Sequence, residues 1–410
     1  MRCAEAAELF SGRASWDLTP SPLAARVAAW RARGLPLLDL SDSNPTRCGL
    51  APAAALRDAL AELATDPASA RYDPDPRGDP AARSAIAAYH GGALAAEHVV
   101  LTAGTSEGYA HLFRLVADPG DRVHLPTPGY GLFEHLAALE GVETERYPLR
   151  APAERGGARW RIDLEALAAG LTPRSRALAV IHPHNPTGSF VDPDDFGALR
   201  ALARERGLAI VSDEVFADYA LDGARPPGAL AGAEDGPLRF ALSGASKLLA
   251  LPQLKVAWIA VAGAAALRDE ALARLEFAAD AYLSISPLAA RTLARLLPRR
   301  DEIQRPVRAR IEGNRAWLAE RIAGSTRVRL LPAEAGWSAV VRVEGEPDED
   351  ALVLGLLERS GVLVQPGYLY DLGADDEGCA LVLSLLLEPR DFARGLDALL
   401  EFVEDRKARS

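Results

Sequence analysis

Lysine is rare in this chain, and its positions indicate where chemistry could take place. Only three of the 46 basic residues are lysines, and two of them, Lys247 and Lys255, lie in the single stretch SGASKLLALPQLKVAW (243–258). A lysine amine can lose its proton and attack a carbonyl carbon, whereas an arginine guanidinium stays protonated and cannot. A residue that forms a Schiff base must therefore be lysine. A lone lysine after a strand is also a common solvated charge, so the neighbouring loops must decide between the two readings.

Two groups of small polar residues have the composition of phosphate sites. Gly104, Thr105 and Ser106 stand between an apolar run and an amphipathic segment, where they would place free amides and hydroxyls at the N-terminus of a helix. Ser243 and Ser246 stand just before the lysine of the first stretch. Ordinary capping of a helix is the alternative reading of the first group.

Three more loops carry single residues of interest. Tyr130 in LPTPGY could stack on a flat ring or simply pack in the interior. Asn185 lies in HPHNPTG, a turn rich in proline and glycine that would hold it rigidly. Asp213 directly follows an apolar run in VSDEVF, where a carboxylate is costly unless it meets a cation or caps a helix. His182 and His184 have no carboxylate or cysteine at ligand spacing, so no metal site is expected.

The elements that must position these residues follow from the hydrophobic pattern. Between about residues 50 and 285, short apolar runs alternate with longer amphipathic segments, which predicts a mostly parallel central sheet flanked by helices, an α/β fold. Chemistry in such sheets gathers at the carboxyl ends of the strands. We expect a large domain over 46–285 and a smaller α+β domain built from 1–45 and 286–410. The expected strands include 98–102, 122–125, 177–181, 208–212 and 257–261.

Composition narrows the classes of function. The net charge is −11 and the cations are scattered, which disfavours nucleic acid and favours a small-molecule partner. Apolar runs such as 381–387 fall well short of a membrane span. Three cysteines without ligand spacing and an acidic start, MRCAEAAELF, predict a cytoplasmic protein.

The order of the motifs carries more weight than any one of them. GTS, PGY, NPTG, SDEVF and SGASK, in this order and spacing, resemble the class I/II aminotransferases, a family of fold type I pyridoxal-phosphate enzymes. LSDSNPT (40–46) resembles the loop at the family's active-site entrance, and RYDPDPRG (71–78) resembles its tyrosine-containing loop. The resemblance spans most of the chain. It implies the fold type I architecture, pyridoxal 5'-phosphate as cofactor and no metal.

The resemblance also implies roles for individual residues. Lys247 would form the Schiff base and then move the proton at the substrate α-carbon, Asp213 would pair with the protonated pyridine nitrogen, and Asn185 would bind the ring oxygen. Tyr130 would stack on the ring, and Tyr72 would reach across from a second subunit, which implies a homodimer. The residues expected around the cofactor phosphate are Gly104, Thr105, Ser106, Ser243, Ser246 and Lys255.

Three positions depart from the family pattern. Lys255 stands where the family commonly has an arginine, so either a compact ammonium binds the phosphate here or the loop is a variant with a solvated charge. Phe216 stands where a tyrosine often donates to the ring oxygen, and Tyr219 is at the wrong spacing to match that motif. Val382 stands where an arginine usually binds the substrate carboxylate. Either the substrate lacks that carboxylate or another cation binds it, and the candidates are Arg47, Arg71, Arg77 and Arg390.

The resemblance favours an aminotransferase that moves an amino group from an amino acid to a 2-oxo acid in two half-reactions. The alternative is a lyase or another non-transaminating enzyme on the same cofactor, because one fold hosts several reactions. A cofactor-sensing regulator would need an effector module, and neither end of the chain has the basic pattern of one. A nucleotide-binding domain would need a glycine-rich phosphate motif, and the chain has none after a strand.

Overall fold

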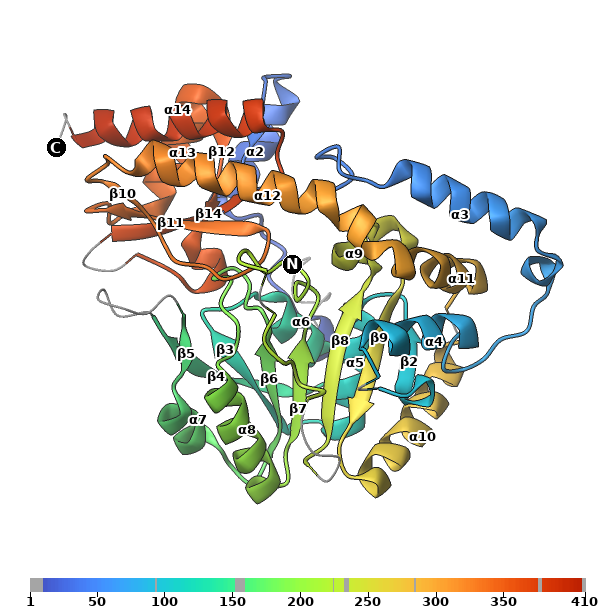
Figure 1. The fold of residues 1–410 in the computed structure, drawn as a ribbon. Helices are drawn as coiled ribbons and strands as arrows, with labels where there is room; N and C mark the ends of the chain where they lie inside the picture. The colour runs from blue at the N-terminus through green and yellow to red at the C-terminus, as the bar shows by residue number, and fades with distance from the viewer. Residues whose placement is uncertain are drawn as a thin grey trace.

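The chain folds around two sheets, one above the other (Figure 1). The structure is a computed structural model and describes residues 10–92, 94–151, 159–223, 225–231, 236–283, 285–374 and 378–407. The larger sheet has eight strands and the smaller has four, and a two-stranded pair lies beside the smaller one. No helix of the described part of the chain has the length and apolar character needed to cross a membrane.

The large sheet is mostly parallel, which confirms the predicted fold class. Its strand order is β2-β9-β8-β7-β6-β3-β4-β5. Two strands, β9 and the edge strand β5, run in the direction opposite to the other strands of this sheet. Because β9 is antiparallel to both β2 and β8, those two strands run in the same direction. The strands are β2 (Val99–Thr102), β3 (Arg122–Thr127), β4 (Glu143–Arg150), β5 (Arg161–Ile162), β6 (Ser175–Ile181), β7 (Ala209–Asp213), β8 (Arg239–Gly244) and β9 (Ala257–Ala262).

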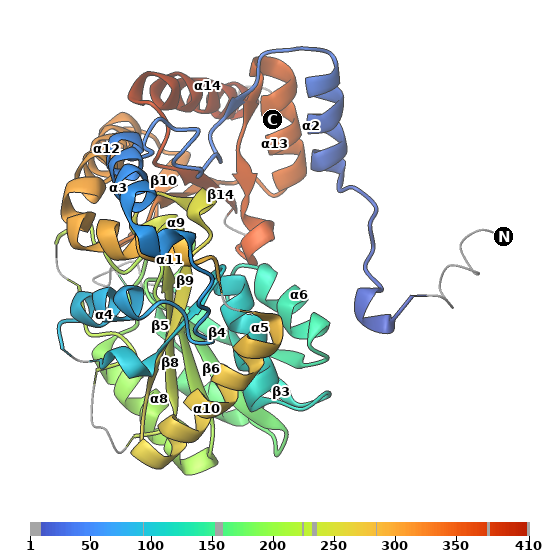
Figure 2. The ribbon, with the colours of Figure 1, turned by 90° about the vertical axis from the view of Figure 1, so that its right-hand side faces the viewer.

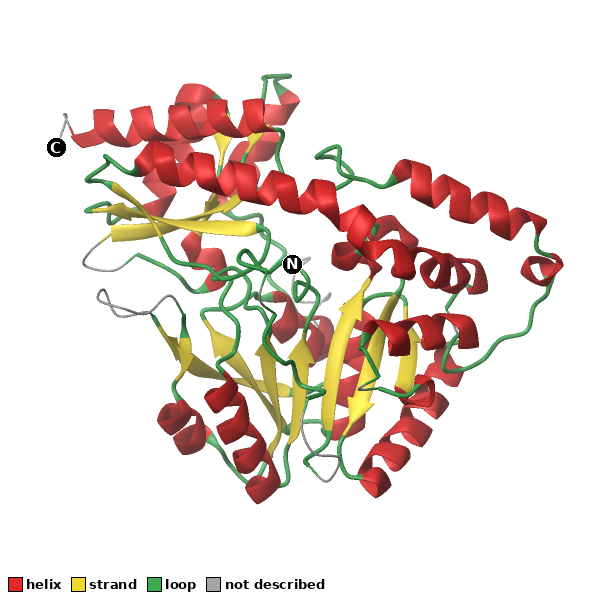
Figure 3. Ribbon diagram, viewed as in Figure 1, coloured by secondary structure: helices red, strands yellow, loops and turns green. Residues whose placement is uncertain are grey.

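Helices cover both faces of this sheet, as Figures 2 and 3 show. One face packs against α5 (Thr105–Val116), α6 (Leu132–Leu139) and α10 (Ala265–Tyr282). The other face packs against two groups of helices. These helices are α3 (Ala53–Thr65), α4 (Pro80–Tyr89), α7 (Leu164–Gly170), α8 (Pro193–Arg206), α9 (Ala245–Leu248) and α11 (Pro287–Leu296). Burial on both faces explains why the central strands are apolar throughout rather than alternating.

Local sequence signals set several helix ends. Asp79 caps α4, and Asp192 caps α8, with Pro80 and Pro193 in the first turns. Gly207 ends α8 in the left-handed conformation at φ 67°. At Gly244, a Cβ would lie 3.0 Å from the Val256 carbonyl oxygen, so the close approach of β8 to β9 requires glycine there.

The smaller sheet is antiparallel, in the order β10-β11-β14-β13, and its strands are β10 (Val328–Leu330), β11 (Ser338–Glu344), β13 (Gln365–Pro366) and β14 (Gly378–Ser384). On the side away from the large sheet lie α12 (Arg300–Ile322), α13 (Glu349–Ser360) and α14 (Pro389–Lys407), with α2 (Pro22–Ala32) beside α13. The pair β1 (Leu38–Asp39) and β12 (Val362–Leu363) is parallel and joins the N-terminal segment to this unit. The remaining elements are short 3-10 turns, namely η1 (Gly12–Ala14), η2 (Pro67–Ala70), η3 (Ala96–His98), η4 (Pro252–Leu254), η5 (Leu297–Arg299) and η6 (Gly367–Tyr370).

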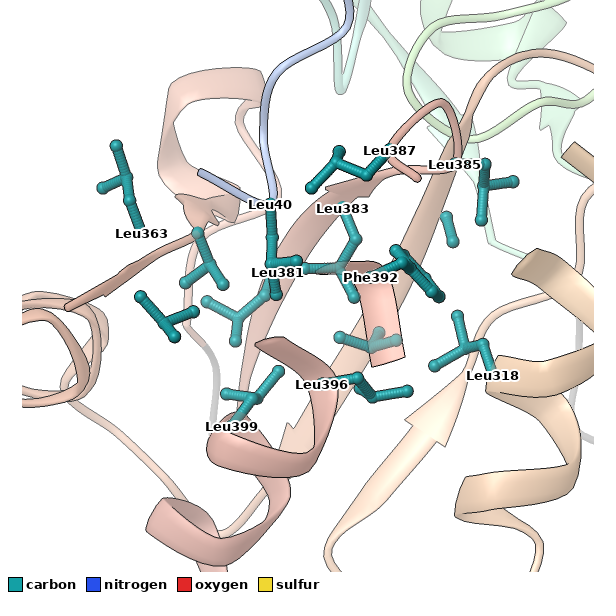
Figure 4. Packing of buried hydrophobic residues seen from close by; sticks show 14 of the residues in the cluster. Leu40, Leu318, Leu363, Leu381, Leu383, Leu385, Leu387, Phe392, Leu396 and Leu399 are labelled. Carbon is teal, nitrogen blue, oxygen red and sulfur yellow. The ribbon is translucent and has the colours of Figure 1, made fainter. Parts of the chain in front are cut away.

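The core of the small unit lies between its sheet and α12, α13 and α14. Leu381 and Leu383 of β14 are fully buried and meet Phe392, Leu396 and Leu399 of α14 (Figure 4). Leu40 of the N-terminal segment packs into the same core. The predicted domain boundaries at 45/46 and 285/286 stay predictions. After residue 285, α11 still packs against α3 and α4 of the large unit, and the following helix, α12, packs in the small unit.

Candidate active site

The predicted site residues lie at or just after strand ends, at one end of the large sheet. Asp213 is the last residue of β7, and Lys247 lies in α9 directly after β8. Asn185 follows β6, and Tyr130 follows β3. Gly104 follows β2, which runs the same way as β8. Carboxyl ends of parallel strands meet at one edge, so the topology gathers these residues beneath the small unit.

The Lys247 amine lies among aromatic rings. Its Nζ is 5.1 Å from the ring centre of Trp337 and 5.5 Å from that of Phe216. Burial lowers the pKa of Lys247, and the charge of Asp213 opposes that shift. The Tyr219 hydroxyl donates to the Lys247 carbonyl oxygen at 2.9 Å. The arrangement favours a neutral amine, which is the nucleophilic form.

Asp213 is a buried carboxylate, and no ion pair within 4 Å is found for it in the described ranges. It accepts a hydrogen bond from the Tyr109 hydroxyl at 3.3 Å and another from the Val215 backbone N–H at 3.1 Å. Burial raises the pKa of Asp213 to about 6, although both hydrogen bonds and the charge of Lys247 act in the opposite direction. A buried carboxylate in this state is a strong binding partner for a cation.

Two of the residues predicted to bind phosphate, Gly104 and Lys255, lie against each other. A Cβ built on Gly104 would lie 3.3 Å from Nζ of Lys255, so the absent side chain leaves room for that ammonium. Thr105 opens α5, and Ser106 follows it with an exposed side chain. The positive end of the α5 dipole and the Lys255 charge therefore lie together. Ser243 of β8 is buried, and its Oγ has no hydrogen-bond partner among the described residues; Ser246, in α9, is half-buried.

Tyr130 and Asn185 follow β3 and β6, at the same end of the large sheet. Tyr130 is 43% exposed, and its ring centre is 6.1 Å from that of Tyr370 in η6. The neighbouring Gly129 N–H donates to the Tyr370 carbonyl oxygen at 2.8 Å, which ties this loop to the small unit. Asn185 is half-buried in the turn after β6. Tyr72 does not join these residues, because it is 78% exposed in the connection between α3 and α4 at the molecule's outer edge.

The two histidines near Asn185 support the loop. His184 hydrogen-bonds through Nδ1 to the Thr187 hydroxyl at 2.9 Å, and His182 accepts from the Val191 N–H at 3.0 Å. Burial lowers the pKa of His184 to about 4, so it stays neutral. Within the residues that the structure describes, no group of three His, Cys, Asp or Glu side chains could hold a metal ion.

Sequence reasoning missed Trp337. This residue precedes β11, 90 positions after Lys247, and no local pattern relates the two. Trp337 is fully buried, and its ring packs edge-on against Phe216 and Tyr219 at 5.5 Å and 5.1 Å. The Tyr219 hydroxyl, already bonded to the Lys247 carbonyl, is therefore committed to the protein backbone.

Val382, which stands where the family usually has an arginine, packs among apolar side chains. Val382 is only 2% exposed and belongs to a cluster with Val340, Ala380 and Tyr370. Neighbours along β14 point to opposite faces, and Leu381 belongs to the core under α14. Val382 therefore faces the large sheet, on the same side as Tyr370. We call these four residues the small-sheet wall.

Comparison with known proteins gives a consistent result. The family model for aminotransferase class I and II matches residues 36–379. An arginine–pyruvate transaminase of Pseudomonas aeruginosa is 31% identical over 367 residues, which cover 87% of this chain and 86% of that protein. An LL-diaminopimelate aminotransferase of Desulforudis audaxviator is 30% identical over 332 residues, or 79% of this chain and 80% of that one. In fold, the chain is similar to an alanine aminotransferase from Pyrococcus furiosus, with a TM-score of 0.85, 18% identity and coverage of 97% and 100% of the two chains.

Proposed function

This chain belongs to the class I and II aminotransferases, pyridoxal-phosphate enzymes that move an amino group from an amino acid to a 2-oxo acid, and we propose that it does so at the site around Lys247, Asp213 and Asn185. One observation carries this assignment. Asp213 at the end of β7 and Lys247 directly after the adjacent strand β8 lie at the same sheet edge, where burial lowers the pKa of Lys247 and raises that of Asp213. Opposed shifts of this kind are typical of catalytic sites.

The residues of the site fit the cofactor. Pyridoxal phosphate supplies, when bound, an aldehyde that a lysine amine can bond and a ring that accepts the electrons released at the substrate α-carbon. Lys247 offers an amine whose surroundings favour its neutral form. Asp213 offers a carboxylate without a cation of its own, which suits a protonated ring nitrogen. The Ser243 hydroxyl, which has no partner among the described residues, and the Lys255 ammonium beside Gly104 suit a phosphate.

Each residue then has a distinct task. Lys247 would hold the cofactor through its amine, and the same amine, when free, would take the proton from the substrate α-carbon as the general base. Asp213 keeps the ring nitrogen protonated by pairing with it, and Asn185 donates to the ring oxygen. Tyr130 stacks on the ring. The residues that bind the phosphate are Gly104, Thr105, Ser106, Ser243, Ser246 and Lys255.

The assembly that fits this site is a homodimer in which Tyr72 reaches the neighbouring site. Support comes from large apolar side chains that stay exposed in the single chain. Tyr72 is 78% exposed, Phe277 80%, Leu283 70% and Tyr282 61%. Three of them, Phe277, Tyr282 and Leu283, lie together at the end of α10, and large apolar side chains that gather on one surface are usually covered. We further infer a cytoplasmic location, which is supported by Cys48 and Cys379 being free thiols.

Product analysis tests the reaction directly. The purified enzyme, loaded with pyridoxal phosphate, is given an amino acid and pyruvate, and the products are separated by chromatography. We expect alanine and the oxo acid of the donor in equal amounts, and loss of both with Lys247→Ala. Release of ammonia without formation of alanine would contradict transamination and favour the lyase alternative.

A further inference from the structure

The substrates of this reaction carry a carboxylate, and among the described residues the face of the small sheet around Val382 offers no free cation to bind it. The small-sheet wall, Val340, Ala380, Val382 and Tyr370, is uncharged and faces the large sheet. Arg342 of β11 points to the same face, but its Nε lies 3.9 Å from Glu344, and Nη2 donates to the Gly378 carbonyl oxygen. A carboxylate against this wall would lose its hydration without a charged partner.

Three of the four arginines expected as alternatives are unsuited by their surroundings. Arg47 forms a two-pronged pair with Asp42, with both contacts at 2.7 Å. Arg77 pairs with Glu276 at 3.1 Å and donates to the Glu97 carbonyl oxygen. Arg390 lies in the first turn of α14, which covers the opposite face of the small sheet from Val382.

Arg71 differs from these three. Its side chain is exposed and has no hydrogen bond or ion pair among the described residues. It lies just after η2, in the connection between α3 and α4 that runs along the molecule's outer edge, away from its own Lys247 in α9 (Figure 1). Its neighbour is Tyr72, the residue proposed to enter the site of a second subunit. An arginine fork is well matched to a carboxylate.

We propose that Arg71 of one subunit binds the substrate carboxylate in the active site of the other, while the small-sheet wall meets the uncharged part of the substrate. The proposal rests on the shared-site dimer of the proposed function. It makes Arg71 a specificity-determining residue for amino acids and 2-oxo acids. It also explains how a carboxylate substrate is accepted although Val382 replaces a cation.

A pair of donors that differ only in the carboxylate tests the role. The parent enzyme, Arg71→Gln and Arg71→Lys are assayed with the preferred amino acid and with the amine left when its carboxylate is removed, such as L-arginine and agmatine. For the amino acid, Arg71→Gln should raise KM by about 10- to 100-fold with little change in kcat, because a charge-assisted hydrogen bond is lost. Arg71→Lys should restore part of the loss, and neither variant should change the kinetics of the amine.

Arg31 provides a matched control. Its side chain is also exposed and has no hydrogen bond or ion pair to the described residues, and it lines a groove beside Ser41 and Gln365 on the small unit. Arg31→Gln should leave KM and kcat unchanged for both donors. If Arg31→Gln raised KM for the amino acid and Arg71→Gln did not, the carboxylate site would lie in that groove and the proposal would be wrong. If Arg71→Gln lowered kcat/KM equally for the amino acid and the amine, Arg71 would have a structural role and the proposal would be wrong.

Hybrid dimers test whether Arg71 acts across the interface. Co-expression of a Lys247→Ala subunit with an Arg71→Gln subunit, each with its own tag, yields dimers with one intact Lys247. If Arg71 acts across the interface, that lysine shares its site with the intact Arg71, and the hybrid shows the parent KM at about half the parent kcat. If Arg71 acts within its own subunit, KM stays raised and the proposal fails.

A second hybrid separates this proposal from the shared-site dimer. Tyr72→Ala replaces Arg71→Gln in the same experiment. If the Tyr72→Ala hybrid regains the parent KM and the Arg71→Gln hybrid does not, the shared site stands and the proposed role of Arg71 is wrong. Failure of both hybrids to recover, or failure of the chains to associate, would reject the shared site itself.

Discussion

The unpaired carboxylate of Asp213 predicts that the protein without cofactor is more stable when that charge is removed. Burial moves the pKa of Asp213 from 3.8 to about 6. One pKa unit corresponds to about 1.4 kcal/mol, so the ionised carboxylate costs the folded state about 3 kcal/mol once the pH is well above 6. The carboxylate accepts from the Val215 N–H through Oδ1 and from the Tyr109 hydroxyl through Oδ2. Asp213→Asn keeps one oxygen for the Val215 N–H, places an NH2 group that can donate to the Tyr109 hydroxyl, and removes the charge.

The sign of the pH dependence follows from the direction of the shift. Asp213 holds its proton more tightly in the folded state than in the unfolded state, so its contribution to stability is greatest below pH 3.8 and is lost as the pH rises through 6. Asp213→Asn should therefore raise the free energy of unfolding by up to about 3 kcal/mol at pH 8 and by much less at pH 4. The same change should weaken binding of pyridoxal phosphate, because its ring nitrogen loses its partner.

Urea unfolding of the cofactor-free protein, followed by circular dichroism at both pH values, measures this difference. Asp195→Asn is the matched control, because Asp195 is equally buried but pairs with Arg161 at 2.7 Å. That variant should be less stable at pH 8, since it removes the closer of the two carboxylates that pair with Arg161; Asp192 stays at 3.4 Å. A loss of stability in Asp213→Asn at pH 8, or a gain of the same size at pH 4, would refute the reasoning.

Three further predictions concern single side chains. Phe216→Tyr adds a hydroxyl beside Lys247 that can donate to the cofactor ring oxygen, so the visible band of the lysine-bound cofactor should titrate at a lower pH than in the parent; an equal or higher value in a spectrophotometric titration would reject this. Lys255→Ala removes the ammonium beside Gly104 and should weaken pyridoxal phosphate binding by about tenfold or more in a fluorescence titration, whereas Lys255→Arg should retain most of the affinity. Leu381→Ala empties a fully buried position of the small unit and should lower the free energy of unfolding by about 2–5 kcal/mol in urea, with Leu60→Ala, an exposed position, changing it little.

Much of the large sheet could be predicted because its central strands are buried on both faces. The expected runs at 98–102, 177–181 and 257–261 coincide with β2, β6 and β9 to within two residues at each end. The pattern does not single out β4 and β8. β4 carries Glu143 and Arg150 near the sheet edge, and β8 begins with Arg239, which is buried and donates to the Ala229 carbonyl oxygen. A charged residue that finds its partner only in the folded chain breaks the hydrophobic pattern.

The candidate site could be predicted where one loop supplies one residue at a strand end. Asp213 ends β7, and Lys247 and Asn185 follow its neighbours β8 and β6; successive parallel strands tend to lie side by side, which the sequence predicts for these three. The contacts of Trp337 with Lys247 and the apolar surroundings of Val382 depend on how the small unit sits on the large sheet. No local spacing encodes that arrangement. The contacts of Trp337 and Val382 could therefore be recognised only in the folded chain.

The most direct measurement of the central claim is chemical trapping at Lys247. The enzyme loaded with pyridoxal phosphate is reduced with borohydride, digested and mapped by mass spectrometry, with and without prior addition of an amino acid. We predict a pyridoxyl group on the peptide that contains Lys247, its loss when the amino acid is added first, and a matching loss of the visible absorption band. A pyridoxyl group on another lysine, such as Lys255, or none on any peptide, would contradict the assignment of the active site.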